Sequence, residues 1–261
     1  MSTIVRATRP WKKDQMSRKR CIMRIRGQSS LDTDEPRFKR ETEMAAPVIR
    51  WLQRRGLRVK PEFSVPWGIC DLVGVKLDPV RVRRRLSYGQ TRPIGPLIRL
   101  QILSRIPEAD SGKSITLEKL KRELSDHLPS DFLSRELDLL VRGNFVTSPR
   151  SNFFQKANGW APLHVRIVAV ELKLTRVSEA LSQAASNRAF ATDSYVALPG
   201  KLALRIERGD RADIFRRTGL GLLAVWHQAC RELVRPSGNK AACSEIIQSH
   251  VVERFWRTRD N

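Results

Sequence analysis

The chain has 261 residues, of which 41% are hydrophobic, enough to bury a core in one large domain or two modest ones. Its 49 Lys and Arg outnumber 27 Asp and Glu and give a net charge of +22, so nucleic acid is the simplest partner and an anionic membrane surface the alternative. Its apolar runs are too short to span a bilayer, and its Cys and His lack zinc-binding spacing, which favours a cytoplasmic, nucleoid-associated protein without zinc.

The first third of the chain begins with a basic segment. Residues 1–38 are predicted to be a disordered tail, because RATRPWKKDQMSRKRCIMRIRG has almost no acid and little periodicity. If the tail has a function, we expect it to act as an arm that binds nucleic-acid phosphates. A helix is expected over residues 39–56, where apolar residues share one face. The alternation over residues 57–76 predicts two strands, and a basic linker is expected over residues 78–93.

Residues 83–160 are predicted to form an inserted, winged-helix-like domain. The stretches GPLIRLQILSRI, SITLEKLKREL and PSDFLSRELDLLVRG predict three helices, and FVTSPRSNFFQK predicts a hairpin after them. This is the layout of a winged helix, which serves to bind either DNA or another protein. The expected DNA contacts are Arg135 and Arg142 on the third helix and Arg150 and Lys156 on the hairpin.

An α/β pattern resumes after the insert, so residues 39–82 and 161–261 are predicted to form one core. HVRIVAVELKL, DSYVALP and GLGLLAV predict strands, while RVSEALSQAASNRAFA, RADIFRRTG and AACSEIIQSHVVERFW predict helices. The expected fold class is α/β: a mixed α+β sheet flanked by helices, with the helical winged-helix-like domain inserted into it.

Charged residues interrupt the apolar strand IVAVELKLT. Glu171 and Lys173 are two positions apart and point to the same face of the strand, although burying an ion pair stabilises a fold poorly. A second acid, Asp71, lies in the apolar strand WGICDLVGV. The first helix adds Glu41 on its buried face, with Glu43 as the alternative. Carboxylates from two strands beside a lysine suit a hard divalent cation and the activation of a water molecule.

The order of these elements resembles the PD-(D/E)XK nuclease superfamily, which includes restriction endonucleases and Holliday-junction resolvases. The resemblance implies a restriction-endonuclease-like core in which Asp71, Glu171 and Glu41 bind Mg²⁺ or Mn²⁺. It implies that Lys173 assists the nucleophilic water, and that Gln183 on the following helix takes part in catalysis.

Two features of the sequence depart from the family pattern. Cys70 stands where the family name has proline, and 100 residues separate Asp71 from Glu171. The predicted insert accounts for that separation. Asn187, one helical turn beyond Gln183, is a further polar residue on the same helix.

The expected function is that of a metal-dependent DNA endonuclease, with the winged-helix-like insert and the basic arm holding DNA. The alternatives are a non-catalytic DNA-binding protein on the same fold, such as a regulator or a recombination, repair or mobile-element accessory, and a protein whose winged helix binds another protein. DNA structure preference, RNA as a substrate, and the pathway, whether repair, recombination or defence, stay open. The oligomeric state also stays open; a homodimer is one option, because many such nucleases pair to cut both strands.

Overall fold

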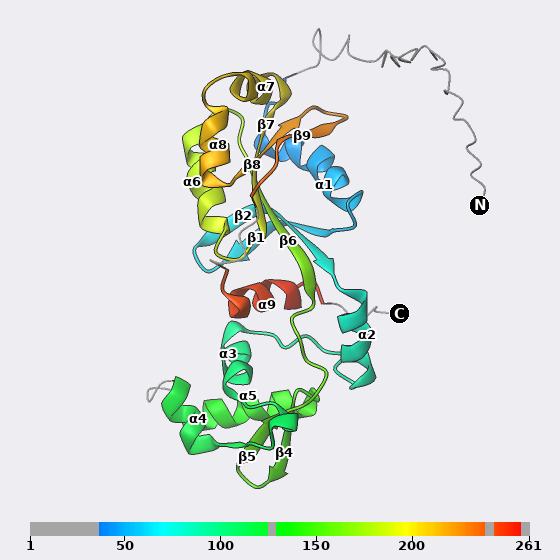
Figure 1. Cartoon of the computed structure of the whole chain (residues 1–261), viewed down its shortest axis with the longest axis vertical. Coiled ribbons are helices and arrows are strands. Elements are labelled where there is room, and N and C mark those ends of the chain that lie inside the picture. Colours follow the sequence, from blue (N-terminus) through cyan, green and yellow to red (C-terminus); the bar gives the residue numbers. More distant parts are fainter. Residues whose placement is uncertain (1–36, 125–128, 238–242, 257–261) are drawn as a thin grey trace, which may run out of the picture. The chain divides into compact units, whose positions relative to one another are not determined.

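The computed structural model describes residues 37–124, 129–237 and 243–256 (Figure 1). All but the last two residues of the predicted basic tail lie outside the described residues. No helix in the described part of the chain has the length and apolar character needed to cross a membrane.

A mixed six-stranded sheet forms the centre of the core, as the predicted fold class required. Strands β6, β7 and β8 are parallel, whereas the β1–β2, β2–β6 and β8–β9 pairs are antiparallel. The order across the sheet is β1 (Arg58–Val65), β2 (Gly68–Leu77), β6 (His164–Leu172), β7 (Asp193–Pro199), β8 (Gly221–Val225) and β9 (Cys230–Val234).

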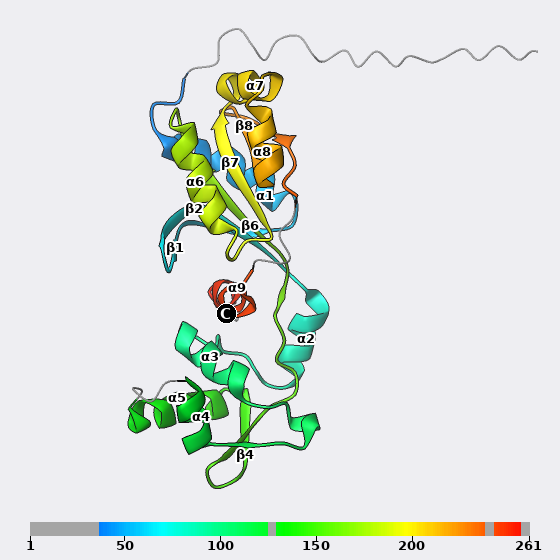
Figure 2. The same ribbon diagram turned by 60° about the vertical axis from the view of Figure 1, so that its left-hand side comes forward.

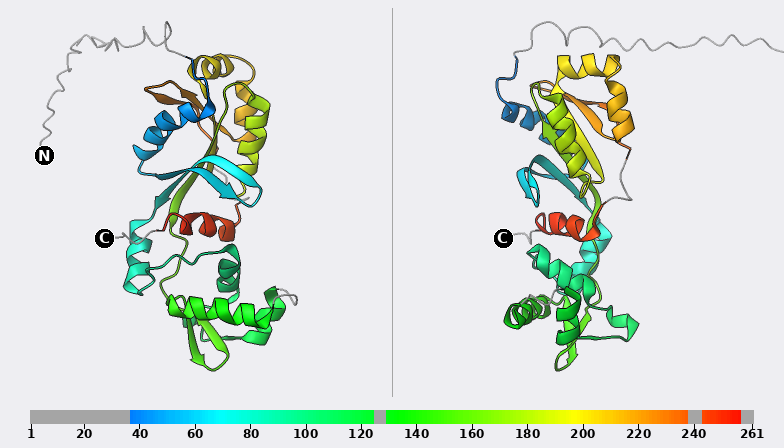
Figure 3. Two further views of the ribbon diagram at one scale, coloured as in Figure 1. Left: turned by 180° about the vertical axis from the view of Figure 1, so that it is seen from behind. Right: turned by 90° about the vertical axis from the view of Figure 1, so that its left-hand side faces the viewer.

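Helices cover both faces of this sheet (Figure 3). A short 3₁₀ turn, η1 (Glu41–Met44), leads into α1 (Ala45–Gln53), which packs on one face. Helices α6 (Val177–Asn187), α7 (Gly200–Arg208) and α8 (Ala212–Thr218) pack on the other. The sequence predicted α1, α6 and α8 but not α7.

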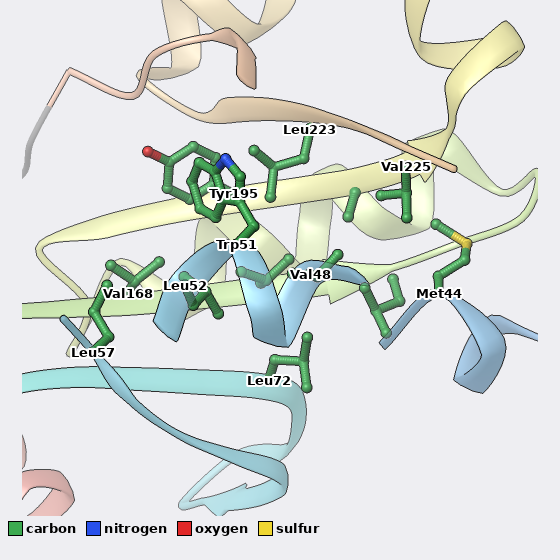
Figure 4. Packing of buried hydrophobic residues seen from close by; sticks show 13 residues of the cluster. Met44, Val48, Trp51, Leu52, Leu57, Leu72, Val168, Tyr195, Leu223 and Val225 are labelled. Carbon is green, nitrogen blue, oxygen red and sulfur yellow. The ribbon is translucent and has the colours of Figure 1, made fainter. Parts of the chain in front are cut away.

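Alternation along the strands divides the core between the two faces of the sheet. Val168 and Val170 of β6 lie in the cluster with α1, while Ala169 faces the opposite cluster. Figure 4 shows Trp51 of α1 against Tyr195 of β7, edge to face, with ring centroids 5.6 Å apart. Burial of such large aromatic side chains is a major apolar contribution to holding α1 on the sheet.

The segment between β2 and β6 has its own apolar core and small sheet. Within residues 93–160, as far as the structure describes them, three α-helices and a hairpin are present, as predicted, and a two-residue strand precedes the second of these helices and joins the sheet in the order β3-β5-β4. The elements are α3 (Leu97–Arg105), η2 (Ala109–Ser111), β3 (Ile115–Thr116), α4 (Leu117–Leu124), α5 (Ser130–Arg142), β4 (Val146–Arg150) and β5 (Phe153–Lys156).

The prediction of a basic linker over residues 78–93 is wrong for its first half, which forms α2 (Pro79–Ser87). The Asp78 side chain accepts hydrogen bonds from the backbone N–H groups of Val80 and Arg81, and Pro79 is suited to the first helical turn. Arg85 of α2 is fully buried and forms a bidentate pair with Glu253, with 2.5 Å between Nη1 and Oε1.

The last helix, α9 (Glu245–Glu253), joins the inserted segment to the core. It lies between the sheet and α3 (Figure 2). Val251 and Val252 pack in the core, and the Glu253 carboxylate accepts the backbone N–H of Ile94, just before α3. The chain therefore returns from the core to fasten the insert at its base.

Candidate functional site

The site begins where β2 separates from β6. Leu72 opposite Val170 is the last pair of their ladder. The next hydrogen bond comes from a side chain: Oδ2 of Asp71 accepts the backbone N–H of Leu172 at 2.7 Å. This bond holds the Asp71 carboxylate at the C-terminal end of β6, beside the polar residues of that strand.

Glu171 is 2% exposed, which is unusual for a carboxylate. The Asn187 amide at the end of α6 donates to its Oε1 at 2.5 Å and also lies 3.4 Å from the Cys70 sulfur. Burial and the negative charge of Asp71 raise the Glu171 pKa to about 7. Burial likewise raises the Asp71 pKa, against the lowering effects of the Leu172 N–H and the Lys173 charge.

Lys173 places its ammonium between two further acids. Its Nζ lies 3.5 Å from Oε2 of Glu41 and 3.6 Å from Oε1 of Glu179, and the residue is 8% exposed. Its backbone N–H donates to Ala197 of β7 at 3.1 Å. The other oxygen of Glu41, Oε1, accepts the N–H of Leu174 at 3.3 Å, so one carboxylate orients both the lysine and the strand end.

The structure separates the two acids considered on the first helix. Glu41 is half-buried and reaches Lys173, as preferred from the sequence. Glu43 is exposed and accepts the backbone N–H of Lys39 at 2.8 Å, a local contact at the start of η1. The four expected residues Glu41, Asp71, Glu171 and Lys173 therefore meet at one end of β6.

Asn187, rather than Gln183, makes the contact from α6 to Glu171. Among the described residues the buried amide oxygen of Gln183 has no hydrogen-bond partner, whereas the Asn187 amide is hydrogen-bonded to Glu171. Glu179 was not expected as part of the site. Its position in the first turn of the helix after the charged strand is the one signal that the sequence offered.

The donors at this site suit a hard cation only in part. Asp71 and Glu171 are two neighbouring oxygen donors, and the charge of Asp71 raises the pKa of Glu171. No group of three or more His, Cys, Asp or Glu side chains within the described ranges is arranged to hold a metal ion. Mg²⁺ commonly binds through one or two carboxylates with water and substrate phosphate, so the pair is sufficient for that mode.

The four cations predicted to contact DNA differ in their surroundings. Arg135 and Arg142 on α5 and Arg150 at the end of β4 are exposed. Lys156 is buried instead: its Nζ pairs with Glu108 at 2.6 Å and lies 5.4 Å from the Trp160 ring centroid. Lys156 thus fastens the insert's own fold, and the exposed arginines are the better candidates for phosphate contact.

Compared with known protein families, curated proteins and solved structures, the chain matches none. The fold defines an α/β protein with a mixed six-stranded sheet flanked by helices. Its charged site lies where β6 ends and β2 separates from it.

Proposed function

We propose that this protein is a metal-dependent DNA endonuclease of the PD-(D/E)XK kind. The observation that carries the proposal is the meeting of Asp71, Glu171 and Lys173 at the end of β6, with two carboxylates that repel one another. The raised carboxyl pKa values beside a lysine support this proposal, because catalytic centres commonly shift the pKa values of their acids by burial and by neighbouring charges.

The proposed roles follow from the contacts. Asp71 and Glu171 would hold Mg²⁺ or Mn²⁺, since a cation between them replaces repulsion with attraction. Such an ion, when bound, lowers the pKa of a coordinated water and offsets charge that develops on the phosphate. Lys173 donates hydrogen bonds to the attacking water, while Glu41 orients its ammonium and Asn187 orients Glu171.

The inserted segment supports a role in holding DNA. Its helices and three-stranded sheet follow the order of a winged helix, and the third helix, α5, carries the exposed Arg135 and Arg142. Arg150 extends the same charge onto the β4–β5 hairpin. Phosphate contacts by these arginines would give binding that weakens with salt.

Cleavage assays test this proposal. Labelled linear, nicked and branched DNA is incubated with Mg²⁺ or Mn²⁺ and with wild type, Asp71→Ala or Lys173→Ala. We expect metal-dependent cutting by wild type, abolished in both variants while DNA binding is retained. Tight, salt-sensitive binding without cutting under any metal would instead establish the non-catalytic DNA-binding alternative.

A further inference from the structure

Helix α7, which the sequence did not predict, carries a row of cations on one exposed face. Lys201, Arg205 and Arg208 follow the spacing i, i+4, i+7 and are all exposed, while Ala203 and Ile206 face the core. None of these three cations forms an ion pair within the described part of the chain.

This row is distinct from an ordinary mixed-charge helix surface. The one acid of α7, Glu207, lies roughly a third of a turn away from the row at 3.6 residues per turn. On α8, by comparison, Arg216 pairs with Asp213 one turn earlier at 2.7 Å. Three cations without acidic partners on one face repel one another, so the arrangement favours a polyanionic ligand over self-pairing.

The row begins at the end of the sheet that carries the candidate site. Ala197 of β7 accepts the backbone N–H of Lys173, β7 ends at Pro199, and α7 starts at the next residue. The start of α7 packs closely on the Trp226 indole at Gly200, where an added Cβ would be 2.1 Å from that ring. Figure 2 shows α7 at the end of the sheet toward which β7 runs.

Residues 38–40 lie at the same end of the sheet. The Phe38 ring stacks on the His227 ring with centroids 4.1 Å apart, and His227 follows the end of β8 closely. Lys39 and Arg40, next to Phe38, are exposed. Two separate parts of the chain therefore bring cations to this end of the sheet.

We propose that the α7 face, with Lys39 and Arg40, binds the phosphate backbone of duplex DNA beside the candidate site; this rests on the proposed nuclease function. Lys201 to Arg208 covers about 10 Å of helix at 1.5 Å per residue. That length spans about three phosphates of one strand at roughly 3.4 Å of duplex axis each. The core then holds the strand to be cut directly, in addition to any contact by the insert.

The test is DNA binding by the full chain in chelator, where no metal-dependent cutting occurs. The test variant is Lys201→Gln/Arg205→Gln/Arg208→Gln. The matched control, Lys76→Gln/Arg83→Gln/Arg84→Gln, removes the same charge from exposed residues at and beyond the end of β2 opposite to Asp71. A third variant, Lys201→Arg/Arg205→Lys/Arg208→Lys, keeps the charge of the row.

The α7 glutamine variant should bind duplex DNA at least about tenfold more weakly near 0.1 M salt, and its slope of log K against log salt should be shallower by up to about 3. The control and the charge-conserving variant should stay within about threefold of wild type. Equal losses in test and control variants, no loss in the test variant, preference for single-stranded RNA, or no DNA binding by wild type would each overturn the proposal.

The cleavage assay separates failure of this inference from failure of the proposed function. If wild type cuts DNA and the α7 glutamine variant cuts it with the same KM, the proposed nuclease function stands and the proposed α7 binding surface is wrong. If wild type binds DNA through α7 but does not cut it, the proposed α7 binding surface stands and the proposed nuclease function is wrong.

Discussion

At the scale of single residues, the site depends on a carboxyl group that burial keeps partly protonated. Glu171 is 2% exposed, and its pKa is raised to about 7 by burial and by Asp71. The unfolded chain would titrate this group near its ordinary value of 4.5. The folded, metal-free protein therefore binds more protons than the unfolded chain between these two pH values.

We predict that metal-free protein loses stability as pH rises from about 4.5 to about 7, because ionised Glu171 is penalised in the fold. The loss from this group should be up to about 3 kcal/mol. Urea unfolding in chelator at pH 5 and pH 8 measures it. Glu171→Gln should remove most of the slope in this pH range, and an unchanged slope would contradict the assignment.

The contact from Asn187 gives a second prediction. Because its amide donates to Glu171 and favours the ionised form, Asn187→Ala should raise the Glu171 pKa and weaken binding of the proposed cation by about tenfold or more. The Mn²⁺ concentration that gives half-maximal cleavage measures this effect. Ser182→Ala, at an exposed position of the same helix, is the control, and an equal shift there would argue against Asn187 as the orienting residue.

The sequence allowed the charged residues of the strands to be predicted but not their partners on α6. Strand alternation places Glu171 and Lys173 on one face whatever the tertiary structure. Which residue of α6 reaches Glu171 depends on how that helix packs on the sheet, so Asn187 and Glu179 became evident from the structure.

At the scale of elements, α2 shows how local chemistry can outweigh composition. Five of the nine residues in PVRVRRRLS are Arg or Ser, and this composition suggested a linker. The helix forms because Asp78 caps it and because Arg85, buried by its pair with Glu253, anchors the far end. That anchor lies more than a hundred residues away in the chain and leaves no local signal.

The cap gives a prediction for this element. Asp78→Ala removes the acceptor for the N–H groups of Val80 and Arg81 and should lower the free energy of unfolding by about 1 kcal/mol. Asp78→Asn, which retains a capping oxygen, should lose less. Both values come from urea unfolding curves, and a larger loss in Asp78→Asn than in Asp78→Ala would contradict the capping role.

At the scale of the whole molecule, the described chain depends on one buried ion pair where the insert meets the core. The Arg85 guanidinium donates hydrogen bonds to the Glu253 carboxylate of α9 and to the carbonyl of Gln90, and it lies 4.3 Å from the Trp256 ring centroid. Arg85→Met should cost about 3–5 kcal/mol, because it leaves the Glu253 charge buried without its partner. Arg85→Met/Glu253→Met should recover part of that loss of stability, as measured by urea unfolding. A double variant less stable than Arg85→Met would argue against this role of the ion pair.

Calorimetric titration of the purified chain with Mn²⁺ tests whether Asp71 and Glu171 form a divalent cation site. We expect saturable binding to wild type that is lost in Asp71→Asn/Glu171→Gln. Binding should be preserved in Glu43→Gln, because the native Glu43 carboxylate contacts the Lys39 backbone and not the site. Equal Mn²⁺ binding by the double variant and wild type, or no binding by wild type, would show that Asp71 and Glu171 do not form such a site.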